Sequence, residues 1–487
     1  MCAVLGACNG YLEEIPQNKQ KLSTTDDYDQ LLNNAYLTQA VLPYIDVLTD
    51  DMDYIVADRR PNFANSADTY LGAHLWDNSI ETTMPNGDEV FAKFYNSAYN
   101  TNVVIDNIDE AVGAVLDMTE VERTRKHIKG EAYALRAFRY FYLVNMYAAP
   151  YDPATCATTP GIPVNLETTA DDKAYRRVSL EKVYGQIVDD LKNAIPLLEE
   201  NLMETGKTRF SALAAKALLA RVYLYMQDWE NAKSTAEKLL AQNGALLDYS
   251  SIAENTDGYA ISEKSPELLF SQGPLNLQCE FSGSGGDFCV SNDLYKLYDE
   301  NDYRQTIYFT RSTQSDSLGL NRKYQMGKHR SYVSDIFTLR TAEGYLNAAE
   351  ACAMLGDAGA ASGWLNRLRG KRIKDYEDVV YTADEIIEQV RVERRKELCL
   401  EGHRWLDLRR YAVCKKSPFK KIIERVYALY DWDGRSVFKY AEVYQLNVDD
   451  PAYVFAIPKA VLEFDKDMPD NIREDREYVR LMYRNNE

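Results

Sequence analysis

The chain has 487 residues, of which 56 are Lys or Arg and 75 are Asp or Glu, so its formal net charge is −19. Such an acidic chain disfavours nucleic acid or a bare anionic membrane surface as a partner, whereas a neutral ligand fits its charge better. No Ser/Gly/Pro-rich linker of any length divides the sequence, which predicts one large interlocked fold.

The first eight residues, MCAVLGAC, end in a pattern that resembles the lipobox of bacterial lipoproteins. Small residues precede Cys8 there, and such a cysteine is lipidated and becomes the new amino terminus. We interpret residues 1–8 as the end of a signal peptide with Cys8 as the lipidation site, although a cysteine can also follow small residues by chance. No other stretch approaches the roughly 20 apolar residues that a membrane-spanning helix needs.

Residues 9–30 are polar and suit a tether that ends by docking onto the folded body, and residues 31–487 then form a single domain. A first helix is predicted over Thr25–Ala40, because its apolar residues recur at three- and four-residue steps. Residues 50–96 change character: Pro, Gly, Asn and Asp are frequent, no helical period persists, and the pattern is typical of loops.

Aromatic and amide side chains are mixed in this loop-rich segment. Sugar rings have apolar faces and a rim of hydroxyls, so flat aromatic rings beside amides suit a glycan. The candidate ligand-binding residues here are Phe63, Tyr70, Trp76 and Asn78. The alternative is that Trp76 and Tyr70 only anchor a long loop to the helical core. His74 has no second ligand nearby and predicts no metal site.

Helical periodicity resumes over Phe91–Val115 and again over Thr119–Ala149. Thr119 and Glu122 have the spacing of a capping box, which predicts the start of the second helix. Pro150 predicts its end, because proline lacks the amide hydrogen that would continue the helix. The apolar face of this helix is broad and must be buried by other helices.

Ser179 and Ser211 are predicted to cap the starts of two further helices.

Two later stretches have matching patterns. The stretch Ala212–Gln242 turns at Asp228 and continues with Ala and Leu residues at fixed offsets, and residues after Asp357 repeat those offsets. Helical hairpins of about 34 residues are typical of tetratricopeptide units, which stack because each one cannot bury its face alone.

Residues 245–332 are again irregular, with a predicted strand at Glu267–Ser271 and a glycine-rich tip between Cys279 and Cys289. Phe281 and Phe288 flank the tip and are further candidate ligand contacts. In an oxidising setting the two cysteines could form a disulfide, or they could remain free. The tip lacks the Lys-Ser/Thr and the strand-to-helix context of a phosphate-binding loop.

One helix is predicted from Thr382 to Tyr411, with another capping box at Thr382 and Glu385. It is dense in Glu, Asp and Arg, which could indicate catalysis. Ion pairs that fix the helix to its neighbours are the favoured interpretation, because Glu and Arg recur at three- and four-residue offsets and no nucleophile motif accompanies His403. Cys352 and Cys399 lie in helical apolar patterns and are predicted to be buried thiols.

Three stretches resemble the SusD family, also called RagB/SusD: GEAYALRAFRYFYLVNMYAAPY at Gly130–Tyr151, the hairpin at Tyr345–Arg369, and ERRKELCLEGHRWLDLRRY at Glu393–Tyr411. Tyr453–Asn471 is a weaker match to a strand, an Ile-Pro turn and a helix, and it has Pro469, Asp470 and Asn471 where the family has Gln-Asn-Pro.

The resemblance implies a mostly α fold of tetratricopeptide-type hairpins, mainly over 91–243 and 333–411, with long loop-rich insertions, a few short strands and a C-terminal segment 412–487. It implies a surface lipoprotein of the outer membrane that binds an oligosaccharide or polysaccharide and partners a SusC-like TonB-dependent transporter, without catalysis, cofactor or metal. The alternatives are a tetratricopeptide-type scaffold for protein or peptide, and a glycoside hydrolase, for which no motif is evident.

Overall fold

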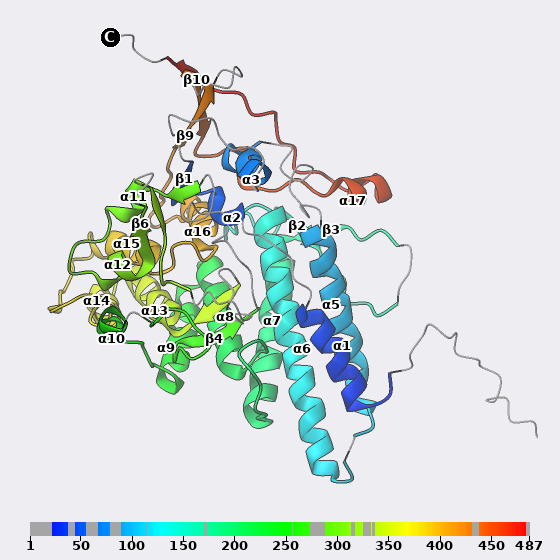
Figure 1. The fold of residues 1–487 in the computed structure, drawn as a ribbon. Helices are drawn as coiled ribbons and strands as arrows, with labels where there is room; N and C mark the ends of the chain where they lie inside the picture. Colours follow the sequence, from blue (N-terminus) through cyan, green and yellow to red (C-terminus); the bar gives the residue numbers. More distant parts are fainter. Residues whose placement is uncertain are drawn as a thin grey trace, which may run out of the picture.

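The structure is a computed structural model, and it describes residues 22–37, 44–54, 67–77, 89–113, 115–169, 173–255, 257–272, 288–312, 317–324, 333, 337–430 and 438–483. Most of these residues are helical. The long helices α5 (Glu89–Asn107), α6 (Met118–Tyr147) and α7 (Leu180–Glu200) lie side by side, and α1 (Thr25–Leu37) packs along α5 and α6 (Figure 1). The predicted mostly α fold is confirmed.

The helix α6 is the centre of this group, and from Gly130 onward almost all of its residues are buried. Its neighbour α7 packs so closely that a Cβ added at Gly130 would lie 2.9 Å from Leu198 Cγ. The predicted capping box is wrong: Asp117 caps the helix by accepting a hydrogen bond from the Thr119 N–H at 2.8 Å. The helix ends before Pro150 as expected.

Two helical hairpins extend this bundle. The first consists of α8 (Ala212–Tyr225) and α9 (Trp229–Gln242), and the second of α13 (Thr341–Leu355) and α14 (Ala358–Arg369). Asp228 caps α9 and Asp357 caps α14. In each case the aspartate carboxylate accepts a hydrogen bond from the backbone N–H three residues later. The two hairpins pack closely, because a Cβ added at Gly344 on α13 would lie only 3.1 Å from the Leu239 side chain on α9. The predicted stacking of repeated units is confirmed.

The predicted single helix from Thr382 to Tyr411 is two helices, α15 (Ile386–Glu397) and α16 (His403–Ala412). Leu400 and Gly402 between them have φ angles of 57° and 75°, which no right-handed helix contains. The Gly402 N–H instead donates a hydrogen bond to the Asp46 carboxylate at 3.0 Å. Beyond this break, α16 packs against the short helix α2 (Tyr44–Val47).

The charged residues of α15 and α16 are buried and form ion pairs, as the sequence predicted, but most partners lie on distant elements rather than along the same helix. Glu397 is the centre of one group. Its carboxylate accepts hydrogen bonds at 2.9 to 3.0 Å from the guanidiniums of Arg304, Arg340 and Arg372. Burial alone would raise the pKa of Glu397, but these three cations hold it well below its usual range.

Short strands and helices connect these parts. The strands pair as β1 (Met52–Tyr54) with β5 (Phe288–Val290), β2 (Pro160–Pro163) with β3 (Arg177–Ser179), β4 (Leu268–Ser271) with β8 (Thr338–Arg340), and β6 (Phe309–Arg311) with β7 (Leu318–Leu320). A three-stranded antiparallel sheet of β9 (Ile423–Tyr430), β10 (Phe438–Leu446) and β11 (Arg480–Met482) stands at one end of the molecule (Figure 1).

The shorter helices are α2 (Tyr44–Val47), α3 (Ala67–His74), α10 (Tyr249–Glu254), α11 (Asn292–Tyr295), α12 (Tyr303–Tyr308) and α17 (Lys459–Phe464). Helix α3 corrects the expectation that no helix interrupts residues 50–96. The predicted strand at the start of Tyr453–Asn471 is absent from the described residues of that stretch, whereas its helix is α17.

Five cysteines in the described part of the chain are free thiols. Cys156, Cys352, Cys399 and Cys414 are buried, and Cys289 is half-buried. Burial and the nearby Asp53 raise the pKa of Cys289 to about 12. Its prospective disulfide partner Cys279 lies outside the described residues.

Among the helices that the structure describes, none is both long and apolar enough to cross a bilayer.

Candidate ligand-binding site

The two segments predicted to face a ligand meet in one antiparallel ladder. Strand β1 comes from residues 50–96 and strand β5 from residues 245–332. Met52 pairs with Val290, and Tyr54 pairs with Phe288. The ladder therefore holds two loop-rich segments together at one place, although they are far apart in the sequence.

The side chains at this junction form an aromatic cluster. The ring of Tyr54 lies 5.7 Å from that of Phe288 and 5.9 Å from that of Tyr427, and the His74 ring lies 5.2 Å from Phe288. All distances join ring centroids, and these contacts are edge-to-face, an arrangement that aromatic rings favour. Burial and the nearby Arg425 hold the pKa of His74 well below its usual range, so its imidazole is neutral.

The prediction that Trp76 stacks on a sugar ring is corrected by the structure. Its side chain is 1% exposed, and its indole N–H donates a hydrogen bond to the Leu48 carbonyl oxygen at 2.9 Å. Phe288 is 0% exposed, so the prediction that its ring contacts a ligand is also corrected. Both rings anchor the junction to the body of the protein, which is the alternative interpretation of Trp76.

The remaining candidates are not tested by the described residues. Phe63, Asn78 and Phe281 lie outside them, as does Cys8, and of Tyr70 the structure describes only the backbone, which belongs to α3. In the sequence, the segments that carry Phe63 and Phe281 adjoin the same end of the β1–β5 ladder, where Tyr54 pairs with Phe288.

An ionic group fixes the junction to α15 and α16. Arg404 donates two hydrogen bonds to the Asp50 carboxylate, at 2.8 and 2.9 Å, and Arg395 lies 2.7 Å from Asp51 and 3.2 Å from Asp50. Burial alone would raise the pKa of Asp50, but Arg404 and Arg395 hold it well below its usual range. The base of the junction is therefore a rigid, charged support.

A polar hollow of about 320 Å³ lies near Trp76, which belongs to the loop-rich segment 50–96. Arg476 forms one wall and donates to Asp450 at 2.7 and 2.9 Å, and Arg473 donates to the Trp76 carbonyl oxygen at 3.4 Å. The lining also contains amide and carboxylate groups, namely those of Gln445, Asn447, Glu474, Asp475 and Glu477. The sequence did not indicate this hollow, because its residues carry no aromatic pattern and come from two separate C-terminal stretches.

Comparison with known proteins places the chain in a family. Residues 9–224 match a family described as "Starch-binding associating with outer membrane", and residues 319–472 match the SusD family. Together the two matches cover more than half of the chain.

Individual relatives agree with these matches. A SusD-like protein of Formosa agariphila is 24% identical, with 83% of this chain and 88% of the relative aligned. The crystal structure of a SusD-like carbohydrate binding protein from Bacteroides vulgatus has a TM-score of 0.71 at 22% identity and covers 93% of this chain and 99% of its own. A SusD superfamily protein from Bacteroides thetaiotaomicron has a TM-score of 0.70 at 21% identity, covering 92% of this chain and 100% of its own. The chain belongs to the SusD family.

Proposed function

We propose that this protein is a non-enzymatic glycan-binding lipoprotein of the outer membrane. The observation that carries the proposal is the β1–β5 ladder, which joins the two loop-rich segments of a SusD-family chain at one rigid junction. Aromatic and amide side chains on those segments would contact the rings and hydroxyls of an oligosaccharide, with Phe63, Asn78 and Phe281 as the first candidates.

The test is an isothermal titration of the full chain, with Cys8 replaced by Ala to avoid lipidation, against a panel of neutral oligosaccharides. We expect saturable binding that weakens in the Phe63→Ala and Phe281→Ala variants. The control is Leu202→Ala, which shortens an apolar side chain that is 71% exposed and lies outside both loop-rich segments, and it should leave binding unchanged. Binding that none of the loop variants weakens would contradict this location of the site.

The proposal includes delivery of the glycan to a SusC-like TonB-dependent transporter. Lipidation of Cys8 would keep the protein at the membrane where such a transporter lies. Co-purification of a TonB-dependent transporter with the lipidated protein from its native membrane tests the partnership, and a Cys8→Ala variant should leave the membrane fraction. A transporter that never co-purifies would contradict this part of the proposal.

A tetratricopeptide scaffold for peptides is a weaker candidate for a structural reason. Such scaffolds bind partners on an exposed concave surface. Here every residue of α13 from Thr341 to Met354 is buried, and so are almost all residues of α8. Among the described residues, the inner helices of both hairpins are thus covered by the protein itself, which favours a structural role for the repeats.

A further inference from the structure

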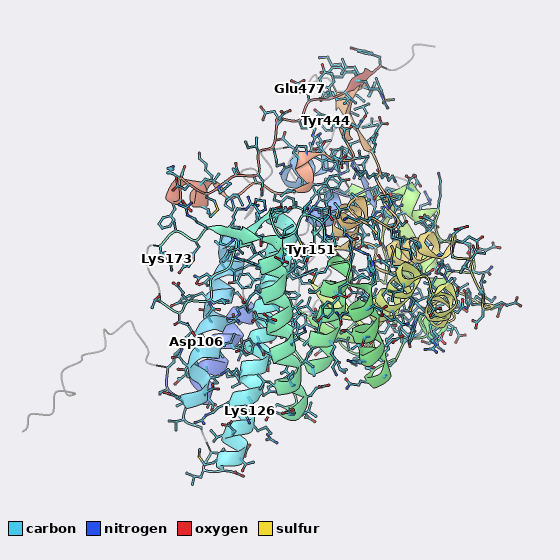
Figure 2. All side chains as sticks on the ribbon, turned by 180° about the vertical axis from the view of Figure 1, so that it is seen from behind. Asp106, Lys126, Tyr151, Lys173, Tyr444 and Glu477 are labelled. Atoms are coloured by element: carbon cyan, nitrogen blue, oxygen red, sulfur yellow. The ribbon has the colours of Figure 1, made fainter. Side chains whose placement is uncertain are left out.

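A second pocket lies away from the β1–β5 junction, between α17, the N-terminal part of α5, and the described residues 163–165 and 173–175. Figure 2 shows Lys173, which lines this pocket, far from Glu477, which lines the polar hollow. We propose that this pocket is an additional subsite for one neutral sugar ring of a longer glycan. The inference rests on the proposed function and extends it to a surface that the sequence did not indicate.

The size of the pocket fits one ring. Its volume is about 210 Å³, whereas pockets for drug-sized ligands measure roughly 300–1,000 Å³. A pocket this small can hold a single ring of an oligosaccharide while the rest of the glycan remains outside.

Aromatic side chains form the apolar part of the lining. Phe91 and Tyr95 have ring centroids 4.6 Å apart, and the Tyr95 hydroxyl is fixed by donating to the Pro163 carbonyl oxygen at 2.7 Å. Phe464 at the end of α17 is 62% exposed, which is unusual for so large an apolar ring. Tyr175 completes the set. Flat rings of this kind suit the apolar face of a sugar.

Two polar side chains in the lining have unused hydrogen-bonding capacity. Asn165 accepts a bond from the Glu167 N–H through Oδ1 at 2.8 Å, whereas its Nδ2 donates to no group in the described residues. Asp465 is 8% exposed and accepts from the Asp467 N–H through Oδ1 at 3.0 Å, while its Oδ2 is buried without a partner in the same part of the chain. A hydroxyl-bearing ligand can accept from Asn165 and donate to Asp465.

The charges of the lining favour a neutral ligand. Lys173 and Asp465 both line the pocket. A charged ligand would therefore be attracted by one of these side chains and repelled by the other. A purely apolar ligand would leave the amide and the carboxylate without partners, which costs free energy in a buried place. Among ring-shaped ligands, a pyranose satisfies both the rings and the polar groups.

The wall that carries Phe464 and Asp465 is held in place. Arg177 donates to the Pro469 carbonyl oxygen and to Asn471 Oδ1, both at 3.0 Å. Asn471 Nδ2 in turn donates to the carbonyl oxygens of Tyr147 and Phe455 at 2.7 Å. The residues that depart from the usual family pattern thus tie the chain beyond α17 to the end of α6, and the subsite is preorganised.

The experiment uses the full chain with Cys8→Ala and isothermal titration with maltohexaose, cellohexaose, xylohexaose and mannohexaose. We expect Phe464→Ala and Asn165→Asp each to weaken binding of the preferred hexasaccharide about tenfold, with thermal midpoints unchanged. Asn165→Asp keeps the Oδ1 acceptor and replaces the donor with a second acceptor. The matched control is Leu202→Ala, an apolar side chain 71% exposed outside this pocket, which should not alter binding.

The outcomes separate this inference from the proposed function. If the parent chain binds a hexasaccharide and neither pocket variant weakens it, the subsite is refuted while glycan binding stands. If the parent chain binds none of the four, and Phe464→Ala has nothing to weaken, both proposals fail. Tighter binding of tetragalacturonate than of every neutral hexasaccharide would overturn the choice of a neutral ligand.

Discussion

Gln227 and Gly356 occupy the same place in the two helical hairpins, and both have left-handed backbone conformations, with φ angles of 60° and 89°. Each directly precedes the aspartate that caps the second helix of its hairpin. The turn therefore requires a positive φ whichever residue is present. Gly356 adopts it without steric cost, whereas Gln227 adopts it at some cost and donates a hydrogen bond to the Val413 carbonyl oxygen at 3.2 Å.

Gly356→Ala should therefore lower the free energy of unfolding by about 1–2 kcal/mol. A Cβ added at Gly356 meets no atom within 4 Å, so the expected loss comes from the backbone conformation alone. Urea denaturation followed by circular dichroism measures it. Gly359→Ala, a helical position on α14, is the control and should be neutral or stabilising. Equal stability of Gly356→Ala and the parent chain would contradict the role of the positive φ.

Trp76→Ala should destabilise the protein by about 3–5 kcal/mol, because it removes a large buried ring. Trp76→Phe should cost less, since it keeps most of the apolar contact and loses mainly the hydrogen bond to Leu48. The measurement is again the free energy of unfolding in urea. A Trp76→Ala variant as stable as the parent chain would show that this ring does not anchor the junction.

Local sequence signals predicted most of the helical fold. The caps at Ser179 and Ser211 are confirmed, because a side-chain oxygen at each accepts a bond from the backbone three residues later. Gly402 is the local feature that marks the break between α15 and α16, but a glycine within a helical pattern can also be a tolerated helical position. The partners of the buried charges could not be predicted, because Asp50 and Arg404 meet only after the whole chain has folded.

The candidate site was less predictable than the fold. Composition identified a segment rich in aromatic residues, but a loop has no period that tells which rings face inward, and Trp76 and Phe288 are buried. The small pocket combines Asn165 with Phe464, which are far apart in the sequence and carry no common pattern. Pockets of this kind depend on how distant segments pack, which one sequence does not reveal.

Arg221 and Glu343 form a buried ion pair between α8 and α13, with two hydrogen bonds of 2.7 and 2.6 Å. Arg221→Met should cost about 3–5 kcal/mol, because it leaves the buried carboxylate with the more distant Arg394, 3.6 Å away. The double variant with Glu343→Leu should be more stable than Arg221→Met alone, since the carboxylate that lost its partner is then removed. A thermodynamic double-variant cycle in urea measures the coupling, and strictly additive losses would contradict it.

Acid should destabilise the protein through its buried carboxylates. Burial alone would raise the pKa of Glu393, but Arg304 and Arg369 lower it to about 2. In the unfolded chain the pKa of a glutamate is about 4.3, so the unfolded state binds the proton first as pH falls. The stability from Glu393 is therefore fully present above about pH 5 and is lost as pH falls toward about 2.

The variant Glu393→Gln isolates this contribution. It should be less stable than the parent chain at about pH 7, and its stability should fall less steeply between about pH 5 and pH 3, because it has no carboxylate to protonate. The exposed control Glu263→Gln should follow the parent chain. Urea midpoints measured across this pH range test whether stability falls with pH. A parent chain that gains stability on acidification would refute the predicted contribution of Glu393.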